Sequence, residues 1–126
     1  MKREMTAALG AVELPLAATF KASVEVSEKV ADPLLISREA MIEGMMISGG
    51  MAYQPKFAFT VSNVPVLLHI GHKAAGGKMT LEQVQEAVFE AGFISAMDQA
   101  AQYIRLLVEP HSDEIEPKDT DAAPGE

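Results

Sequence analysis

Two histidines that lie three positions apart are the first candidates for chemistry in this chain of 126 residues. His69 and His72 fall on one face of a predicted helix and could share a metal ion, since imidazole is a common zinc ligand. A zinc site needs further ligands, and neither a third ligand at matching spacing nor an HExxH pattern accompanies them. We therefore interpret both as surface or interhelical histidines and predict no metal site.

A glycine-lysine segment is the second candidate, because Gly-Gly-Lys-Met-Thr at 76–80 precedes a predicted helix whose first amides could hold a phosphate. The Walker A motif follows a strand and places Lys directly before Ser or Thr. Here Met79 separates Lys78 from Thr80, and the preceding element is predicted to be a helix. We interpret the segment as a turn between helices and keep a small-ligand or phosphate site as the third option for function.

The remaining residue types do not favour catalysis. The chain has no cysteine, which excludes cysteine nucleophiles, thiolate zinc sites and disulfides within it. Ser, His and acidic residues occur, but not in an order or an apolar setting that indicates a catalytic triad or paired catalytic carboxylates. We predict a protein that is not an enzyme and uses no cofactor.

Charge and hydrophobicity limit the partners and the compartment. The net charge of −8 disfavours nucleic-acid binding, which needs a basic surface to displace counterions from phosphates. No apolar run approaches the ~18 residues of a membrane helix, and Glu4 and Glu13 interrupt the only stretch that resembles a signal peptide. We expect a soluble, cytoplasmic protein that binds neither nucleic acid nor membranes.

The elements that position these residues are best marked near the C-terminus. Thr80 and Gln83 fit a capping box and Gly92 a helix stop, which predicts a helix over 81–91. The next helix is predicted to use Ser95 as its N-cap. Its apolar residues recur at helical spacing and are expected to form a buried stripe: Ile94, Met97, Ala101, Ile104 and Val108.

A helix is also predicted over 20–30, with Thr19 as its N-cap. Phe20, Val24 and Val30 recur on one of its sides. We expect this apolar side to face the core and the charged side to face water.

Two longer helices are predicted between these segments. Asp32 suits an N-cap that is followed by a proline at the first helical position, which predicts a helix over 33–48. Ser62 or Asn63 is expected to cap the other helix, which contains Gly71. A glycine among apolar helix residues could let a neighbouring helix approach closely.

The ends of the chain differ in composition from its middle. Residues 1–10 are predicted to be flexible, and the alternation over 12–16 indicates an edge strand. Residues 110–126 are rich in acids and are predicted to be a disordered tail. The fold class that we expect is mainly α, with a single domain over 11–109: a compact bundle of about five helices with a short N-terminal β-strand or hairpin.

Eight methionines give the chain adaptable apolar side chains, which suit both a core and a binding surface. Residues 49–60, which contain several aromatics, are predicted to be an ordered loop. The candidate partner-binding residues come from the helix over 33–48, this loop and the last helix: Met41, Met45, Met46, Met51, Tyr53, Phe57 and Met97.

The order of short motifs resembles the small tail proteins of gene transfer agents and related tailed phages. The motifs are ATFKA at 18–22, DPLL at 32–35, TLEQV at 80–84 and EAG at 90–92, and the resemblance covers about residues 10–108. Proteins of that family are tail assembly chaperones, also described as tail tube proteins. Relative to them, the N-terminal hairpin is expected to be shortened to one strand, and residues 53–59 look like an insertion.

The resemblance implies a protein that coats the long, apolar, helical tape-measure protein before the tail tube polymerises around it. It also implies a homo-oligomer, since several copies along one partner would cover apolar surface that water would otherwise contact. The alternative is a small adaptor or regulatory helical domain that binds a partner helix in a groove.

Overall fold

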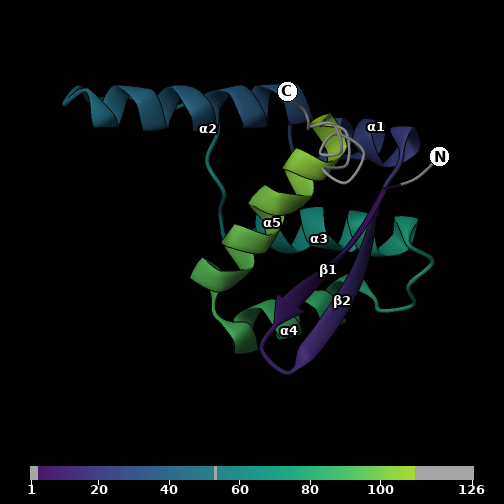
Figure 1. Cartoon of the computed structure of the whole chain (residues 1–126). Coiled ribbons are helices and arrows are strands. Elements are labelled where there is room, and N and C mark those ends of the chain that lie inside the picture. The colour runs from purple at the N-terminus through teal and green to yellow at the C-terminus, as the bar shows by residue number, and fades with distance from the viewer. Residues whose placement is uncertain (1–2, 53, 110–126) are drawn as a thin grey trace, which may run out of the picture.

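The computed structural model describes residues 3–52 and 54–109, and it confirms a mainly helical fold with an N-terminal hairpin (Figure 1). The predicted disordered tail, residues 110–126, lies outside the described residues. The elements in chain order are β1 (Arg3–Leu9), β2 (Val12–Ala18), α1 (Phe20–Lys29), α2 (Pro33–Ser48), α3 (Asn63–Ala74), α4 (Leu81–Ala91) and α5 (Phe93–Val108).

The N-terminal segment forms a full hairpin, so the predictions of a flexible N-terminus and of a shortened hairpin are wrong for residues 3–9. β1 pairs antiparallel with β2 and places Ala7 opposite Leu14. Ala7 and Leu9 are buried while their neighbours are exposed, which is the alternation of a half-buried strand. The sequence pattern of this strand is weak because only two of its residues are buried and one of them is a small alanine. Pairing with β2 and packing against the helices stabilise the strand.

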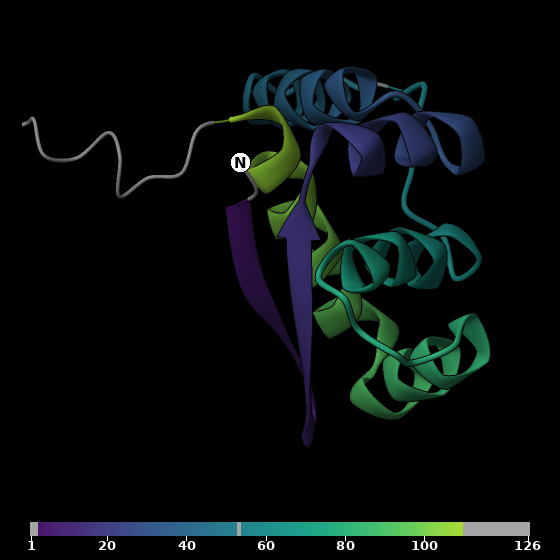
Figure 2. The same ribbon diagram turned by 90° about the vertical axis from the view of Figure 1, so that its right-hand side faces the viewer.

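The helices cover one face of this hairpin. β2 packs against α3, and β1 packs against α5. In Figure 2, α1, α3 and α4 lie one above another beside the hairpin, and α3 contacts both of the others. α3 is therefore the central helix, and Gly71 and His72 on it are buried, while His69 is half-buried.

A close contact between α3 and α5 fixes the centre of the core. Tyr103 of α5 is fully buried, and its hydroxyl donates a hydrogen bond to the carbonyl oxygen of Ala17 at 2.7 Å. A Cβ atom on Gly71 would lie 2.8 Å from Cζ of this ring, which confirms that Gly71 permits a close approach. Burial raises the pKa of the Tyr103 hydroxyl, so it stays a donor at neutral pH.

Most predicted helix starts are confirmed by their hydrogen bonds. In the capping box of α4, Thr80 Oγ1 accepts from the Gln83 amide at 3.1 Å and Gln83 Oε1 accepts from the Thr80 amide at 2.9 Å. Thr19 caps α1 and Asp32 caps α2 through their side chains. These boundaries depend on a few neighbouring residues, which is why the sequence predicts them well.

The start of α3 uses a different pair from the one expected. Ser62 precedes the helix but makes no side-chain capping bond. Instead, Thr60 Oγ1 accepts from the Asn63 amide at 3.0 Å, and Asn63 Oδ1 accepts from the Thr60 amide at 2.8 Å. The last loop residues and the first residue of α3 are thereby held together.

The start of α5 is also different, because Ser95 is not its N-cap. The helix begins at Phe93 directly after Gly92, whose φ of +97° turns the chain between α4 and α5. The carbonyl oxygen of Gly92 already accepts from the Ala96 amide at 3.1 Å. Ser95 therefore lies inside the first turn, where its hydroxyl caps nothing.

The buried sides of α1 and α5 agree with the predicted ones only in part: Ile104 is buried and Val30 packs against the core, but several other stripe residues are exposed. α1 buries Ala22 and Val26 against the body, while Phe20 is 86% exposed and Val24 is also exposed. The residues of α5 that are buried are Ala96, Ala100, Tyr103, Ile104 and Leu107. Small alanines let the helices lie close to the core, and several larger residues of the predicted stripes, such as Phe20 and Ile94, turn outward.

An ion-pair cluster joins α1 to α3, and it gives a pH-dependent prediction. The Glu25 carboxylate accepts from Lys73 Nζ at 2.7 Å and Lys29 Nζ at 2.9 Å, and these bonds, Lys73 first, lower its pKa. A carboxyl group whose pKa is lower in the folded state stabilises the folded protein at pH values above the pKa of the unfolded state. This stabilisation is lost as the pH falls through the pKa of the folded state.

We expect Glu25→Gln to lower the free energy of unfolding at pH 7 by roughly 0.5–1 kcal/mol, because the pair is partly exposed. Urea unfolding at several pH values measures it. The difference from wild type should begin to shrink near the unfolded carboxyl pKa of about 4.3 and vanish once the pH is below the lower folded pKa. A difference that is independent of pH would contradict this role for the carboxylate.

Candidate partner-binding groove

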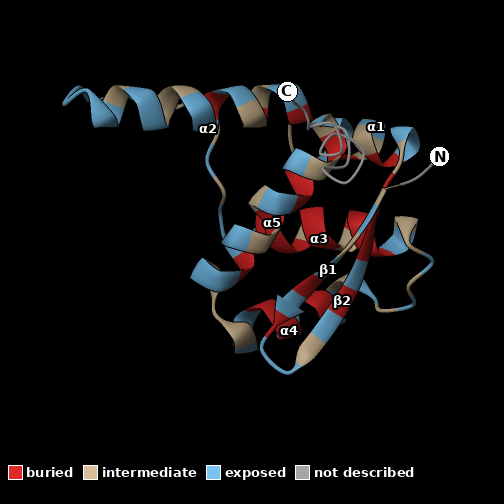
Figure 3. Cartoon of the chain, in the orientation of Figure 1, coloured by how far each residue is buried: buried red, intermediate tan, exposed pale blue. Residues whose placement is uncertain are grey.

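The second half of α2 extends beyond the body of the protein (Figures 1 and 3). The buried residues of α2 are Pro33, Ile36 and Glu39, which all lie in its first half. Residues 40–48 include none that is buried, and a Cβ atom on Gly44 would have no described atom within 4 Å. We call residues 40–48 the arm.

The arm is apolar although it is exposed. Met41, Met45 and Ile47 are each more than half exposed, and so is Met51 just after the helix. Glu43 is the one charged residue among residues 40–52 of the sequence. A helix that is apolar on several sides is normally buried, so this arm indicates a surface that a partner covers.

Gly44 allows a test of how free the arm is. Glycine in a helix interior is less favourable than alanine by about 1 kcal/mol, and here an added methyl group would meet no described neighbour. We therefore expect Gly44→Ala to raise the free energy of unfolding by about 0.5–1 kcal/mol, as measured by urea unfolding. A loss of stability would show that the arm packs closely against another part of the protein.

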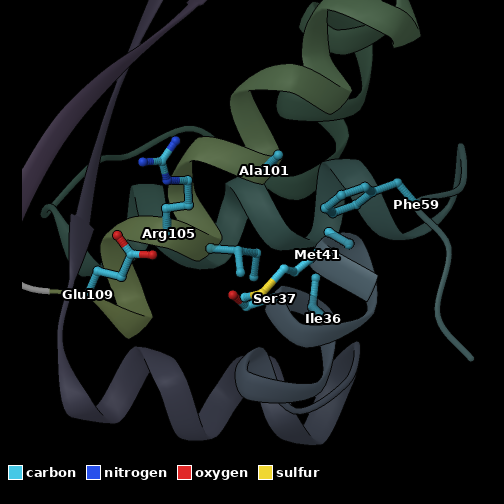
Figure 4. A pocket seen from close by; sticks show the side chains of 9 residues that line it. Ile36, Ser37, Met41, Phe59, Ala101, Arg105 and Glu109 are labelled. Atoms are coloured by element: carbon cyan, nitrogen blue, oxygen red, sulfur yellow. The ribbon is translucent and has the colours of Figure 1, made fainter. Parts of the chain in front are cut away.

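An apolar groove lies between α2 and α5, at the base of the arm (Figure 4). It has a volume of about 230 Å³. Arg105 and Glu109 lie at one end of it and Phe59 at the other, as Figure 4 shows. The residues that line it are Ile36, Ser37, Ala40, Met41, Phe59, Ala101, Ile104, Arg105 and Glu109.

The loop that returns from the arm forms one wall of this groove. Phe57 and Phe59 pack edge to face, with ring centroids 5.2 Å apart and planes at 87°. The amide of Lys56 donates to Oε1 of Glu39 at 2.9 Å, and this carboxylate is buried beneath the loop. The loop is therefore joined to α2 at Lys56, and its aromatic residue Phe59 lies beside the groove.

The apolar surface of α5 is wider than the core requires. Its inner side holds the buried residues, whereas Ile94 is 78% exposed and Met97 is partly exposed. Ala101 and Ile104 continue the same side of the helix into the groove. The stripe that the sequence assigned to the core is therefore divided: Ile94 and Met97 face outward, whereas Ile104 is buried and borders the groove.

The structure brings some of the predicted binding residues to this region. Met41 lines the groove, Met45 and Met51 are exposed on and just after the arm, and Met97 lies one turn before Ala101. Met46 and Phe57 are half-buried, and Tyr53 lies outside the described residues.

Sequence reasoning missed other members of the groove: Ile36, Phe59, Ala101 and Ile104. The apolar side of α5 is wider in the sequence than one neighbouring element can cover. This width could have indicated that part of α5 borders a groove.

His72 has a structural role that agrees with its interpretation as an interhelical residue. Its Nδ1 lies 3.0 Å from the carbonyl oxygen of Pro15 and must donate to it, while Nε2 accepts from the Met79 amide at 3.3 Å. The ring also packs on Gly77, where a Cβ atom would overlap it. His72 thereby ties the hairpin to the turn before α4, and both ring nitrogens are occupied.

His69 does not complete a metal site with this ring. Burial, followed by the nearby Lys73 charge, lowers the pKa of His69. Within residues 3–52 and 54–109, no three or more His, Cys, Asp or Glu side chains are grouped so that they could hold a metal ion. Nor is any helix of this part long and apolar enough to cross a membrane.

Comparison with known proteins finds no matching family model, no matching curated protein and no matching solved structure.

Proposed function

We propose that this chain is a tail assembly chaperone of a phage-like particle or gene transfer agent. In this role it acts in the cytoplasm without enzymatic activity and binds the tape-measure protein or a similar helical protein. The observation that carries the proposal is the apolar arm of α2, which extends without a described covering element beside an apolar groove. The resemblance of the motifs to tail proteins supplies the identity of the partner.

The groove and arm suit a helical partner for physical reasons. Helix-in-groove recognition places apolar anchors at i, i+3, i+4 and i+7 of the bound helix into a hydrophobic channel. Methionine side chains such as Met41 and Met45 adapt to anchors of different shape, because they are unbranched and polarizable. A protein that must cover a long helix of varied sequence needs such tolerance, and several copies would cover it together.

An adaptor or regulatory domain that binds one partner helix is the alternative, and the same groove supports it. The genes next to the coding sequence distinguish the two functions, since capsid, tail tube and tape-measure neighbours would accompany a tail protein. A phosphate site at the start of α4 has weaker support. The amides of Thr80 and Gln83 are already bonded within the capping box.

Co-expression with a tape-measure segment tests the proposal. We expect the wild-type protein to keep this segment soluble and to co-purify with it. Replacing Met41, Met45 and Ile47 together by Gln should weaken binding at least tenfold, because each exposed apolar side chain buried on binding contributes about 1 kcal/mol. Isothermal titration calorimetry on the purified components measures the affinity.

The control is Phe20→Gln, which removes an apolar side chain that is even more exposed, from α1 rather than from the arm. It should bind the segment as the wild type does. A wild-type protein that remains monomeric and has no affinity for the segment would overturn the chaperone function. Equal binding by the triple variant would overturn the role of the arm.

A further inference from the structure

We propose that the arm and the groove of one copy of this chain bind the groove and the arm of a second copy, so that the free protein is a two-fold symmetric dimer. This inference goes beyond the proposed function, because it concerns the protein without its helical partner. The resemblance implies a homo-oligomer, and the inference adds the surface, the symmetry and one ion pair.

The two apolar surfaces are complementary in form and lie side by side in one chain. The arm projects, whereas the groove is a hollow of about 230 Å³ at its base (Figures 1 and 4). Met41 belongs to both surfaces, because it lines the groove and is more than half exposed. Met45 is also exposed and lies one turn further along the same side of α2. A two-fold axis near Met41 that sets the two copies of α2 antiparallel places Met45 opposite Ser37, which lines the groove of the other copy.

The charges of the two surfaces are complementary as well. Glu43 is the one charged residue among residues 40–52, and Arg105 is the one basic residue of the groove lining. Within the part of the chain that the structure describes, neither takes part in an ion pair. Glu39, a second acid on α2, is buried and bonded to the loop. The axis near Met41 therefore brings the carboxylate of each copy toward the guanidinium of the other, and symmetry forms this pair twice.

A closed dimer covers the arm in both copies. An isologous contact buries the same surface twice, whereas a contact in one direction leaves an arm and a groove open and continues from copy to copy. Exposed apolar patches favour association, so a closed arrangement also limits further growth. Because the arm comprises only residues 40–48, the interface is small compared with that of obligate dimers, and we expect a dissociation constant of micromolar order.

Charge reversal on each side tests the contact by sedimentation velocity on the full chain. Glu43→Arg and Arg105→Glu should each weaken dimerisation by at least about tenfold, because like charges then meet at two symmetric places. An equimolar mixture of the two variants should dimerise within about threefold of the wild type, since opposite charges face each other again in the mixed dimer. An ion pair within one copy cannot produce this rescue, because neither variant carries both partners.

Two further variants separate this contact from other effects. Glu28→Arg makes the same charge change at an exposed site of α1 and should dimerise as the wild type does. If net charge alone governed association, Glu43→Arg and Glu28→Arg would both strengthen it, since the chain carries −8. Met45→Gln leaves the charge unchanged and should weaken dimerisation by about tenfold, because two apolar contacts are lost. Circular dichroism verifies that every variant is folded.

Each contrary result overturns the inference for its own reason. A wild type that is monomeric at about 0.5 mM has no such interface. A mixture that dimerises no better than the single variants separates Glu43 from Arg105. Growth into species larger than a dimer identifies a contact in one direction. The proposed function is tested separately: a monomer that binds the tape-measure segment overturns only this inference, whereas a dimer without affinity for that segment contradicts only the proposed function.

Discussion

Tyr103→Ala is expected to lower the free energy of unfolding by about 3–5 kcal/mol, the range for removing a large aromatic ring from a core. The side chain is fully buried between α3, α5 and the hairpin, and its hydroxyl bonds to the carbonyl oxygen of Ala17. Its loss would leave a cavity and a carbonyl without this donor. Urea unfolding followed by circular dichroism measures the change.

A domain of this size has a total stability of about 5–15 kcal/mol, so the alanine variant could be largely unfolded. Tyr103→Phe keeps the ring and removes the hydroxyl alone, and it should cost about 1–3 kcal/mol because the buried acceptor loses its partner. A phenylalanine variant as stable as the wild type would show that the hydrogen bond to Ala17 contributes nothing to folding.

Gly71→Ala should lower the free energy of unfolding by about 1–2 kcal/mol. The new Cβ atom would lie 2.8 Å from Cζ and 2.9 Å from Cε1 of Tyr103. Such overlap in a packed core lowers the free energy of unfolding by about 1–3 kcal/mol, whereas replacing a helical glycine by alanine raises it by up to about 1 kcal/mol. The ring has little freedom to move, because it is buried and its hydroxyl is bonded.

The matched control is Gly44→Ala, the same substitution in the exposed arm, which should stabilise the protein. Comparing the two separates the intrinsic preference of a helix for alanine from the steric effect of the ring. The double variant of Gly71→Ala with Tyr103→Ala provides a second control, since the cavity accommodates the methyl group. Its loss should be smaller than the sum of the single losses, and strict additivity would contradict direct contact.

The proposed function depends on the arm, whereas Tyr103 and Gly71 support the core. α5 carries both Tyr103 on its buried side and Ala101 on the groove side. Displacing this helix would therefore alter the groove as well as the stability. Binding assays on core variants consequently require a measurement of the folded fraction before any loss of affinity is assigned to the groove.

The sequence by itself determined where most helices begin and end. The capping box of Thr80 with Gln83, the Asp32 cap and the Gly92 stop involve residues within a few positions of one another. Such local chemistry requires no knowledge of the rest of the fold. The close approach at Gly71 could also be anticipated, although its partner, Tyr103, could not.

Only the tertiary structure decided which side of each apolar helix is covered. Helical spacing identifies a stripe, but α1 and α5 have apolar residues on more than one side, and their alanines allow the closest packing. β1 likewise exists because it pairs with β2 and packs on α5. Where α2 extends past α5, residues that pattern analysis treats like core residues remain exposed, and those residues form the candidate binding surface.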